Sequence, residues 1–220
     1  MTTWAVLLAA GSGERFGADR PKAFVKLGGL PLLAEPLGRL DASGWIDAIV
    51  VVAPPEWEEP AILLAEELGA GKVVECVTGG ATRADSLRAG LAAVPEDAVA
   101  VAVHDAARPL VADDVVERVL TPLSEGWDGV VPALAIPDTV KRVRGDEVVE
   151  TVPRDELVAV QTPQAFVAPV LREAAAAGGE ASDCAGLVEA RGGRVRVVPG
   201  DPSLLKVTTP ADLERVESWL

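Results

Sequence analysis

The sequence predicts an α/β fold with a doubly wound, mostly parallel sheet of the Rossmann-like kind. Short runs of Val, Ala, Ile and Leu, without polar alternation, recur at 4–10, 48–53, 72–77, 98–104, 129–133 and 194–198. Such runs are typical of strands that are covered on both faces. Helical patterns separate them, at 32–40, 56–68, 83–93, 113–124 and 170–177. Strands and helices in alternation indicate βαβ units and hence a parallel sheet with helices on both faces.

The end of the chain carries a well-marked helix start. Thr209 is in the position of an N-cap, Pro210 is at the first helical position and Asp212 completes a capping box. The 220 residues, 49% of them hydrophobic, can bury one sizeable core. We therefore expect a single domain over residues 1–220 rather than two small ones.

Composition and charge exclude several classes of protein. A formal net charge of −14 repels nucleic acid and anionic lipid. Cys76 and Cys184 match neither a disulfide framework nor a metal-ligand spacing, so reduced thiols are expected. No apolar run approaches the ~20 residues of a membrane span, and the N-terminal run has no basic residue before it. We expect a cytoplasmic protein that binds neither nucleic acid nor membrane.

One segment departs from the α/β pattern. Polar and apolar residues alternate in pairs over 138–154, on both sides of a Gly145-Asp146 turn, which predicts a β-hairpin. A lone two-stranded hairpin is marginally stable in water and should dock on something. We predict that residues 136–157 form a hairpin arm that reaches a second subunit; a charged surface loop is the alternative.

A glycine-rich loop at 9–17 follows the first strand, and Lys22 comes soon after it. Glycines at this place let backbone N–H groups approach phosphate oxygens. Arg15 and Lys22 add the fixed positive charge that a triphosphate requires. The loop has neither the dinucleotide-binding spacing, because Phe16 replaces the third glycine, nor the Gly-Lys-Ser/Thr of a Walker A loop. The sequence thus predicts a phosphate cradle of another kind.

A second candidate site follows the apolar strand at 98–104. Ligands of open α/β sheets bind at the carboxyl ends of the strands, where Asp105 and Arg108 lie. One carboxylate at this edge suits Mg²⁺, which takes one or two protein carboxylates together with substrate phosphates. A helix N-cap is the alternative role for Asp105. His104 is the only histidine, which excludes a histidine-based metal cluster or catalytic triad and favours a structural or positioning role.

A third motif lies in the loop at 78–82 and the start of the following helix. Gly79 and Gly80 permit a close approach to a flat base, and Arg83 and Ser86 can reach the base or the ribose. A simple turn before a capped helix is the alternative. Shorter polar segments follow at 160–164, 182–183 and 205–208.

These motifs occur in one order along the chain. They are Ala-Ala-Gly-x-Gly-x-Arg, Pro-Lys, Gly-Gly-x-x-Arg-x-x-Ser, His-Asp-Ala-Ala-Arg-Pro, Asp-Thr-x-Lys, Thr-Pro-Gln and Lys-Val-Thr. In this combination the sequence resembles, over essentially its whole length, the nucleotidyltransferase family that makes 4-diphosphocytidyl-2-C-methyl-erythritol from CTP and 2-C-methyl-erythritol 4-phosphate. It differs from the usual pattern at Ala81, Thr82, Ser182, Cys184 and Leu205.

The resemblance implies roles for individual residues. The CTP phosphates would be held by Ala9, Ala10, Gly11, Gly13, Arg15 and Lys22, and the cytidine by Gly80, Ser86 and Ala106. The acceptor would meet Asp105, Arg108, Thr162 and Lys206, together with Thr139, Lys141 and Arg154 from the arm of the partner subunit in a homodimer. Arg15, Lys22, Arg154 and Lys206 would act in catalysis, and Asp105 would bind Mg²⁺.

The implied reaction needs no general base, because the acceptor phosphate is already an anion that can attack the α-phosphorus of CTP in line. Catalysis would then consist of positioning and charge neutralisation. Ribitol-5-phosphate cytidylyltransferase is the nearest alternative, and a guanylyltransferase of cofactor synthesis is a more distant one. A dinucleotide-binding module without turnover is a third, but binding alone would require neither Lys22 nor Asp105.

Overall fold

The computed structural model describes residues 2–11, 16, 20–179 and 181–220. An eight-stranded sheet has the order β10-β7-β11-β6-β1-β4-β5, with β12 beside β7. Its strands are β1 (Thr3–Leu8), β4 (Ala48–Ala53), β5 (Val73–Thr78), β6 (Ala100–Asp105), β7 (Gly129–Ala135), β10 (Val158–Val160), β11 (Gln164–Val167) and β12 (Val195–Pro199). The pairs β6–β1, β1–β4, β4–β5 and β12–β7 are parallel, so the predicted mostly parallel sheet is confirmed.

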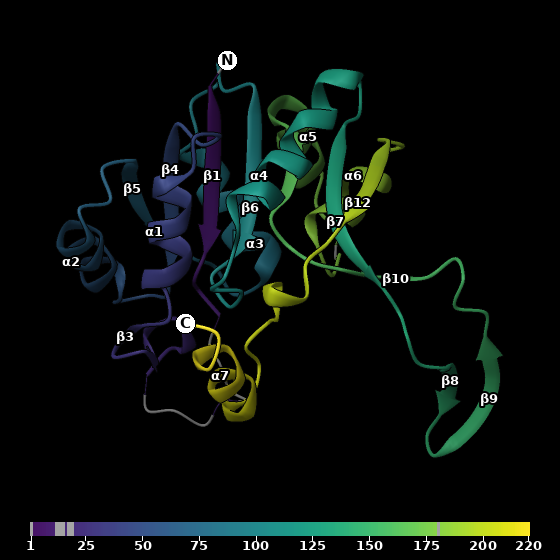
Figure 1. Ribbon diagram of the computed structural model, residues 1–220. Helices are drawn as coiled ribbons and strands as arrows, with labels where there is room; N and C mark the ends of the chain where they lie inside the picture. Colours follow the sequence, from purple (N-terminus) through teal and green to yellow (C-terminus); the bar gives the residue numbers. More distant parts are fainter. Residues whose placement is uncertain (1, 12–15, 17–19, 180) are drawn as a thin grey trace.

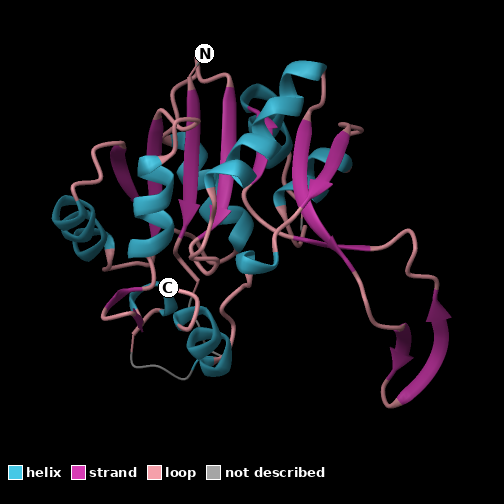
Figure 2. Cartoon of the chain, viewed as in Figure 1, coloured by secondary structure: helices cyan, strands magenta, loops and turns pink. Residues whose placement is uncertain are grey.

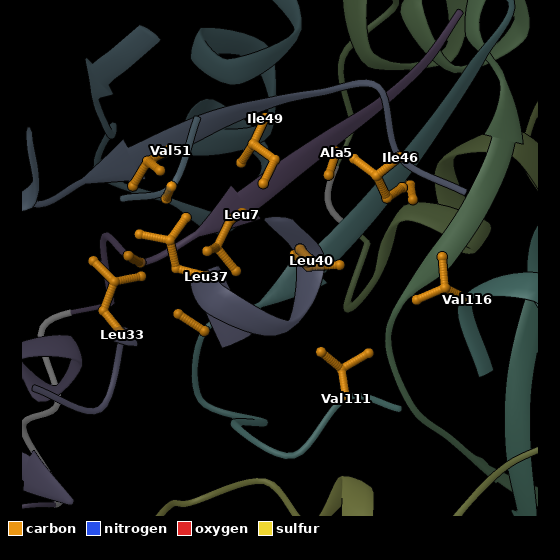
Figure 3. Packing of buried hydrophobic residues seen from close by; sticks show 14 of the residues in the cluster. Ala5, Leu7, Leu33, Leu37, Leu40, Ile46, Ile49, Val51, Val111 and Val116 are labelled. Atoms are coloured by element: carbon orange, nitrogen blue, oxygen red, sulfur yellow. The ribbon is translucent and has the colours of Figure 1, made fainter. Parts of the chain in front are cut away.

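Helices cover both faces of this sheet (Figures 1 and 2). They are α1 (Ala34–Ala42), α2 (Glu58–Leu68) and α4 (Asp113–Leu120) on one face, and α3 (Arg83–Ala92), α5 (Ala168–Ala176) and α6 (Cys184–Glu189) on the other. Successive residues of a strand point to opposite faces. Ala5 and Leu7 accordingly pack with α1 and α4 (Figure 3), whereas Val6 packs with α3 and α5. Because both faces of β1 are buried, each in its own hydrophobic core, polar and apolar residues do not alternate along this strand.

The sequence did not predict β11, which runs antiparallel between β6 and β7. Gln164 pairs with Val103 of β6, and Ala165 pairs with Val130 of β7. The strand β10 is also antiparallel to β7. Strands as short as these carry too few residues for a hydrophobic period, and the six-residue helix α6 was missed for the same reason.

Smaller elements complete the body of the molecule. They are the strands β2 (Lys26–Leu27) and β3 (Leu30–Pro31), the 3₁₀ helices η2 (Lys22–Phe24), η3 (Thr121–Glu125) and η4 (Pro202–Leu204), and the helix α7 (Pro210–Glu217). The capping box of Thr209 and Asp212 at the start of α7 is confirmed. Val216 of this helix packs against Leu27 and Leu32, which places the end of the chain beside the segment that carries β2 and β3.

The predicted hairpin is confirmed as β8 (Val140–Arg144) and β9 (Glu147–Val152), and it projects away from the body (Figure 1). Gly145 in its turn has a φ of +56°, a conformation that favours glycine. Most side chains of both strands are exposed, including Val143 at 58% and Val148 at 56%. The hairpin therefore gains little stabilisation from packing on the body of its own chain.

In the part of the chain that the structure describes, no helix has both the length and the apolar character needed to cross a membrane.

The close packing of α3 on the sheet yields a stability prediction. A Cβ at Gly90 would lie 2.5 Å from Cγ1 of Val6 and 2.8 Å from Cγ2 of Val52, so Gly90→Ala should lower the free energy of unfolding by about 1–3 kcal/mol. Gly38 is also inside a helix but has open space around it, so Gly38→Ala should raise this free energy by up to about 1 kcal/mol. Urea unfolding of both variants checks the opposite signs; equal signs would contradict the packing argument.

Candidate functional site

A cavity of about 380 Å³ lies at the carboxyl ends of β1 and β6, where the fold class places its ligands. We call it the glycine-loop cavity. Of the residues predicted as functional, its walls contain Ala9, Ala10, Gly11, Lys22, Gly80, Arg83, Ser86, Asp105, Ala106 and Lys206. Gly13 and Arg15, which were predicted to hold phosphates, lie outside the described residues.

A second cavity, of about 410 Å³, adjoins the first. We call it the arm-side cavity, because Val158 and Val160, just after the hairpin arm, form part of its wall. Arg108 and Thr162 also line it, and it shares Arg83, Asp105 and Lys206 with the glycine-loop cavity. The two cavities therefore meet at one cluster of charged side chains.

The predicted arm residues Thr139, Lys141 and Arg154 are not brought to this place within one chain. Among the described residues that line the two cavities, none comes from 136–157. Lys141 donates instead to Oγ1 of Thr151 across the hairpin, at 2.6 Å. Within this chain these side chains therefore lie outside the described walls of both cavities.

The carboxylate of Asp105 is the centre of the shared charge cluster. Its Oδ1 accepts from Nη2 of Arg83 at 3.1 Å, and its Oδ2 accepts from Nζ of Lys206 at 2.7 Å. Burial favours the protonated acid, but the charges of Arg83 and Lys206 outweigh burial and hold the pKa of Asp105 well below its usual range. The side chain is an anion at neutral pH.

Arg83 is held from two sides. It is the first residue of α3, which begins with a capping box formed by Thr82 and Asp85. Besides its bonds to Asp105, its Nη1 donates to Sγ of Cys184 at 3.2 Å. Burial raises the pKa of the Cys184 thiol to about 11, so the sulfur is a neutral acceptor. Cys184 was noted in the sequence only as a difference from the family, and no spacing could have linked it to Arg83.

The predicted glycine pair has a structural reason in addition to any contact with a base. A Cβ at Gly79 would lie 2.2 Å from Cβ of Ala10, and one at Gly80 would lie 2.3 Å from Cβ of Asp85. The backbone N–H of Gly80 donates to Oγ of Ser86 at 3.2 Å. Gly79 therefore lets the loop before α3 lie against the loop after β1, and Gly80 lets the same loop lie against the first turn of α3.

A strap, residues 200–207, carries Lys206 across the site. Nη1 of Arg108 donates to the Leu204 carbonyl at 2.6 Å, and Nζ of Lys22 donates to the Val207 carbonyl at 3.0 Å. Gln161, whose role the sequence did not suggest, donates to the Asp201 carbonyl and accepts from the Asp201 N–H, at 2.8 and 3.0 Å. Two of the predicted cationic residues thus also fix the strap.

His104 is completely buried beneath the cluster. Its Nε2 lies 2.9 Å from the Arg108 carbonyl and its Nδ1 lies 3.1 Å from Oγ1 of Thr162. Burial lowers the pKa of His104 to about 4, which leaves the ring neutral at pH 7. These contacts agree with the structural or positioning role expected from the sequence.

The side chains in this site suit a metal ion that takes most of its coordinating oxygens from a bound substrate rather than from the protein. Among the described residues there is no group of three His, Cys, Asp or Glu side chains that could hold an ion. The single ionised carboxylate of Asp105 matches the needs of a divalent cation that obtains most of its oxygens from phosphates and water.

A Rossmann-like sheet with a glycine-rich loop and a basic cavity at its strand ends, joined to a second cavity at one carboxylate, defines the class as a nucleotidyltransferase. The family model of 2-C-methyl-D-erythritol 4-phosphate cytidylyltransferase (IspD) matches residues 3–220. The chain belongs to this family of enzymes.

Individual relatives agree with the family match. A 2-C-methyl-D-erythritol 4-phosphate cytidylyltransferase of Nocardia farcinica is 48% identical over 98% of this chain and 93% of its own length. One from Rhodococcus jostii is 48% identical over 95% of this chain and 91% of its own. The crystal structure of the Thermus thermophilus enzyme has a TM-score of 0.79 at 36% identity, covering 97% of this chain and 96% of that one. The Francisella tularensis structure has a TM-score of 0.84 at 28% identity, with both chains fully covered.

The charge cluster predicts a pH-dependent loss of stability. Asp105→Asn leaves Arg83 and Lys206 without their anion, which should cost about 3 kcal/mol of unfolding free energy at pH 7. The pKa of Asp105 is lowered by folding, so its contribution is present above the unfolded pKa of about 4 and is lost as pH falls below it. The difference between wild type and variant should therefore shrink below pH 4.

A surface pair provides the control for that measurement. Asp114 pairs with Arg118 on α4 and is 63% exposed, so Asp114→Asn should change the free energy of unfolding by less than about 1 kcal/mol. Urea unfolding of both variants at pH 7 and at pH 3 makes the comparison. A loss for Asp105→Asn that is as small as that for Asp114→Asn would contradict the central role of the cluster.

Proposed function

We propose that this chain transfers a cytidylyl group from CTP to 2-C-methyl-D-erythritol 4-phosphate and releases pyrophosphate. The observation that carries the proposal is the contact between the two cavities at Arg83, Asp105 and Lys206. Two anionic substrates bound on either side would meet there. An oxygen of the acceptor phosphate would form a bond to the α-phosphorus as the bond from that phosphorus to the bridging oxygen breaks.

The glycine-loop cavity is the proposed CTP site. Ala9, Ala10 and Gly11 line this cavity, and the N–H of Ala9 already donates to the Val52 carbonyl at 2.8 Å. The backbone N–H groups of Ala10 and Gly11, with Gly13 and Arg15 beyond the described part, would therefore hold the triphosphate. Among the described residues, a Cβ at Gly11 would have no neighbour within 4 Å, which supports open room for a ligand on that side of the loop. The cytidine would lie against the remaining wall, formed by Gly80, Arg83, Ser86 and Ala106.

Charge neutralisation is the proposed source of catalysis. Lys22 and Lys206 line the cavity, and we assign them, with Arg15, to the charge that develops on the α-phosphoryl group and on pyrophosphate. The strap and its hydrogen bonds hold Lys206 and Lys22 in fixed places before substrate arrives. Cations that already lie beside the cavity need only a local change of hydrogen-bond partner when the phosphates bind, which leaves little reorganisation for the reaction itself.

Mg²⁺ is the proposed cofactor, with Asp105 as its protein ligand. When bound, the ion would supply positive charge to the phosphates. Arg83 and Lys206 occupy the carboxylate oxygens of Asp105, so their donors would turn to phosphate oxygens when Asp105 takes up its role as a ligand. Arg83 and Lys206 are suited to this exchange because both line the cavity.

The arm-side cavity is the proposed acceptor site, with Arg108, Thr162 and Lys206 in its wall. We propose that residues 1–220 act as one domain within a homodimer, in which residues 136–157 of one subunit reach the acceptor site of the other. Thr139, Lys141 and Arg154 would come from this arm, with Arg154 in a catalytic role. The exposed Val143 and Val148 support this proposal, because an unpacked hairpin needs a partner surface.

Pyrophosphate release tests the reaction directly. We expect turnover with CTP, Mg²⁺ and 2-C-methyl-D-erythritol 4-phosphate, and little turnover with GTP or ATP, because the pocket beside Gly80 would exclude the larger purines. Ribitol 5-phosphate, measured in parallel, identifies the alternative acceptor. Preference for ribitol 5-phosphate or for GTP would replace the proposed reaction, and the absence of turnover with any pair would leave a binding module.

Complementation tests the shared site. If the arm acts across a two-fold dimer, Asp105→Asn and Arg154→Ala homodimers should both be nearly inactive. A mixed dimer would collect both defects in one site and leave the other site intact. Refolding the two variants together in equal amounts should restore roughly a quarter of wild-type activity, if subunits pair at random.

The control for this experiment is Arg144→Ala, which removes an exposed cation near the turn of the same hairpin and should leave the homodimer active. Mass measurement confirms that mixed dimers have formed. If they have formed and no activity returns, Arg154 acts within its own subunit or not at all, and the shared site is excluded.

A further inference from the structure

A continuous chain of hydrogen bonds lies beneath the acceptor site. The backbone N–H of Asp105 donates to Oγ1 of Thr162 at 3.1 Å. Oγ1 of Thr162 lies 3.1 Å from Nδ1 of His104, and Nε2 of His104 lies 2.9 Å from the Arg108 carbonyl. Thr162 and His104 are both buried, so water does not compete for these bonds.

Which group donates and which accepts in each of these hydrogen bonds follows from the backbone groups at the two ends of the network. The Arg108 carbonyl can only accept, so Nε2 of His104 carries a proton and donates. In the neutral ring Nδ1 is then an acceptor, and the Thr162 hydroxyl must donate to it. The lone pairs of that hydroxyl remain for the N–H of Asp105. One tautomer of His104 and one rotor of Thr162 therefore satisfy all the groups.

The same hydrogen-bond network fixes the turn that carries Asp105 and Arg108. The N–H of Arg108 donates to the Asp105 carbonyl at 2.9 Å, which folds residues 105–108 into a turn. The imidazole of His104 spans this turn from below and fixes its far end. Through Thr162 the same ring ties the turn to the connection between β10 and β11, which forms another wall of the arm-side cavity.

We infer that His104 is a positioning residue for the acceptor site, and that its hydrogen bonds to the Arg108 carbonyl and the Thr162 hydroxyl set the relative places of Asp105, Arg108 and Thr162. The inference rests on the proposed cytidylyl transfer. His104 lies in the wall of neither cavity among the lining residues described, so it acts through its three partners and not by contact with substrate.

The location of this hydrogen-bond network predicts which kinetic constants change when His104 is replaced. Two of its partners, Arg108 and Thr162, line the arm-side cavity only, whereas the glycine-loop cavity has Ala9, Ala10 and Gly11 on independent segments. Loss of the imidazole should therefore raise the KM for the acceptor and lower kcat, with a smaller rise in the KM for CTP, because Asp105 and Ala106 of the same turn also line the glycine-loop cavity. Misplacement of reacting groups by ~1 Å can reduce a rate about 100-fold, which is the loss we expect in kcat/KM for the acceptor.

The test is a double-mutant cycle with steady-state kinetics for both substrates. His104→Leu removes both ring nitrogens, Thr162→Val removes the hydroxyl at nearly constant shape, and Thr162→Ser keeps the hydroxyl as the control. We expect the double variant to lose no more than the worse single variant, because residues of one network are not additive. Thr162→Ser, which keeps the hydroxyl, should lose less of the acceptor kcat/KM than Thr162→Val. His104→Asn, which can still accept from Thr162, takes the place of His104→Leu if the latter does not fold.

Three results would overturn the inference: wild-type acceptor kinetics in a folded His104 variant, equal increases in the KM of both substrates, or multiplied losses in the double variant. Wild-type turnover is measured first. If wild type does not turn over, the proposed function fails; if wild type is active and His104 variants are indifferent, only the positioning role fails.

Discussion

The carboxylate of Asp105, held between Arg83 and Lys206, is the interaction on which the site depends. It joins segments that are 22 and 101 residues apart in the sequence, namely the end of β6, the start of α3 and the strap. Such contacts must offset the conformational entropy of ordering the groups that make them. Here the buried anion and its two cations define the boundary between two cavities, so the same contact stabilises the fold and divides the site.

The charge around this boundary is positive, opposite in sign to the net charge of the chain. The formal net charge is −14, yet among the described residues that line the glycine-loop cavity Lys22, Arg83 and Lys206 accompany a single carboxylate, Asp105. Nearby groups that could add charge are kept neutral by burial: the pKa of His104 is lowered to about 4 and that of Cys184 is raised to about 11. A local positive region in an acidic protein attracts small polyanions while long ones are repelled.

The features that could be predicted from the sequence are those whose signal lies within a few neighbouring residues. The apolar run of β6, the capping box at Thr209 and the Gly145-Asp146 turn each carry their signal within a few residues. What escaped prediction depends on tertiary register. Gln161 reaches Asp201 from the connection between β10 and β11, and the N–H of Cys184 donates to the side-chain oxygen of Gln164 on β11. The four residues of β11 give no periodic signal of their own. Thr162 was predicted to bind substrate, but its inward hydrogen bonds to Asp105 and His104 could be found only in three dimensions.

The antiparallel insertion of β11 has a consequence for how the protein is made. The sub-sheet β5-β4-β1-β6 contains only residues up to 105 and can pair as soon as these have emerged from the ribosome. β7 is synthesised next, but in the sheet order it reaches β6 only through β11, which follows after the excursion of the arm. Until residues 164–167 are available, β6 has an open edge, and open strand edges promote aggregation. The nascent chain thus passes through a vulnerable interval that the arm between β7 and β11 makes longer.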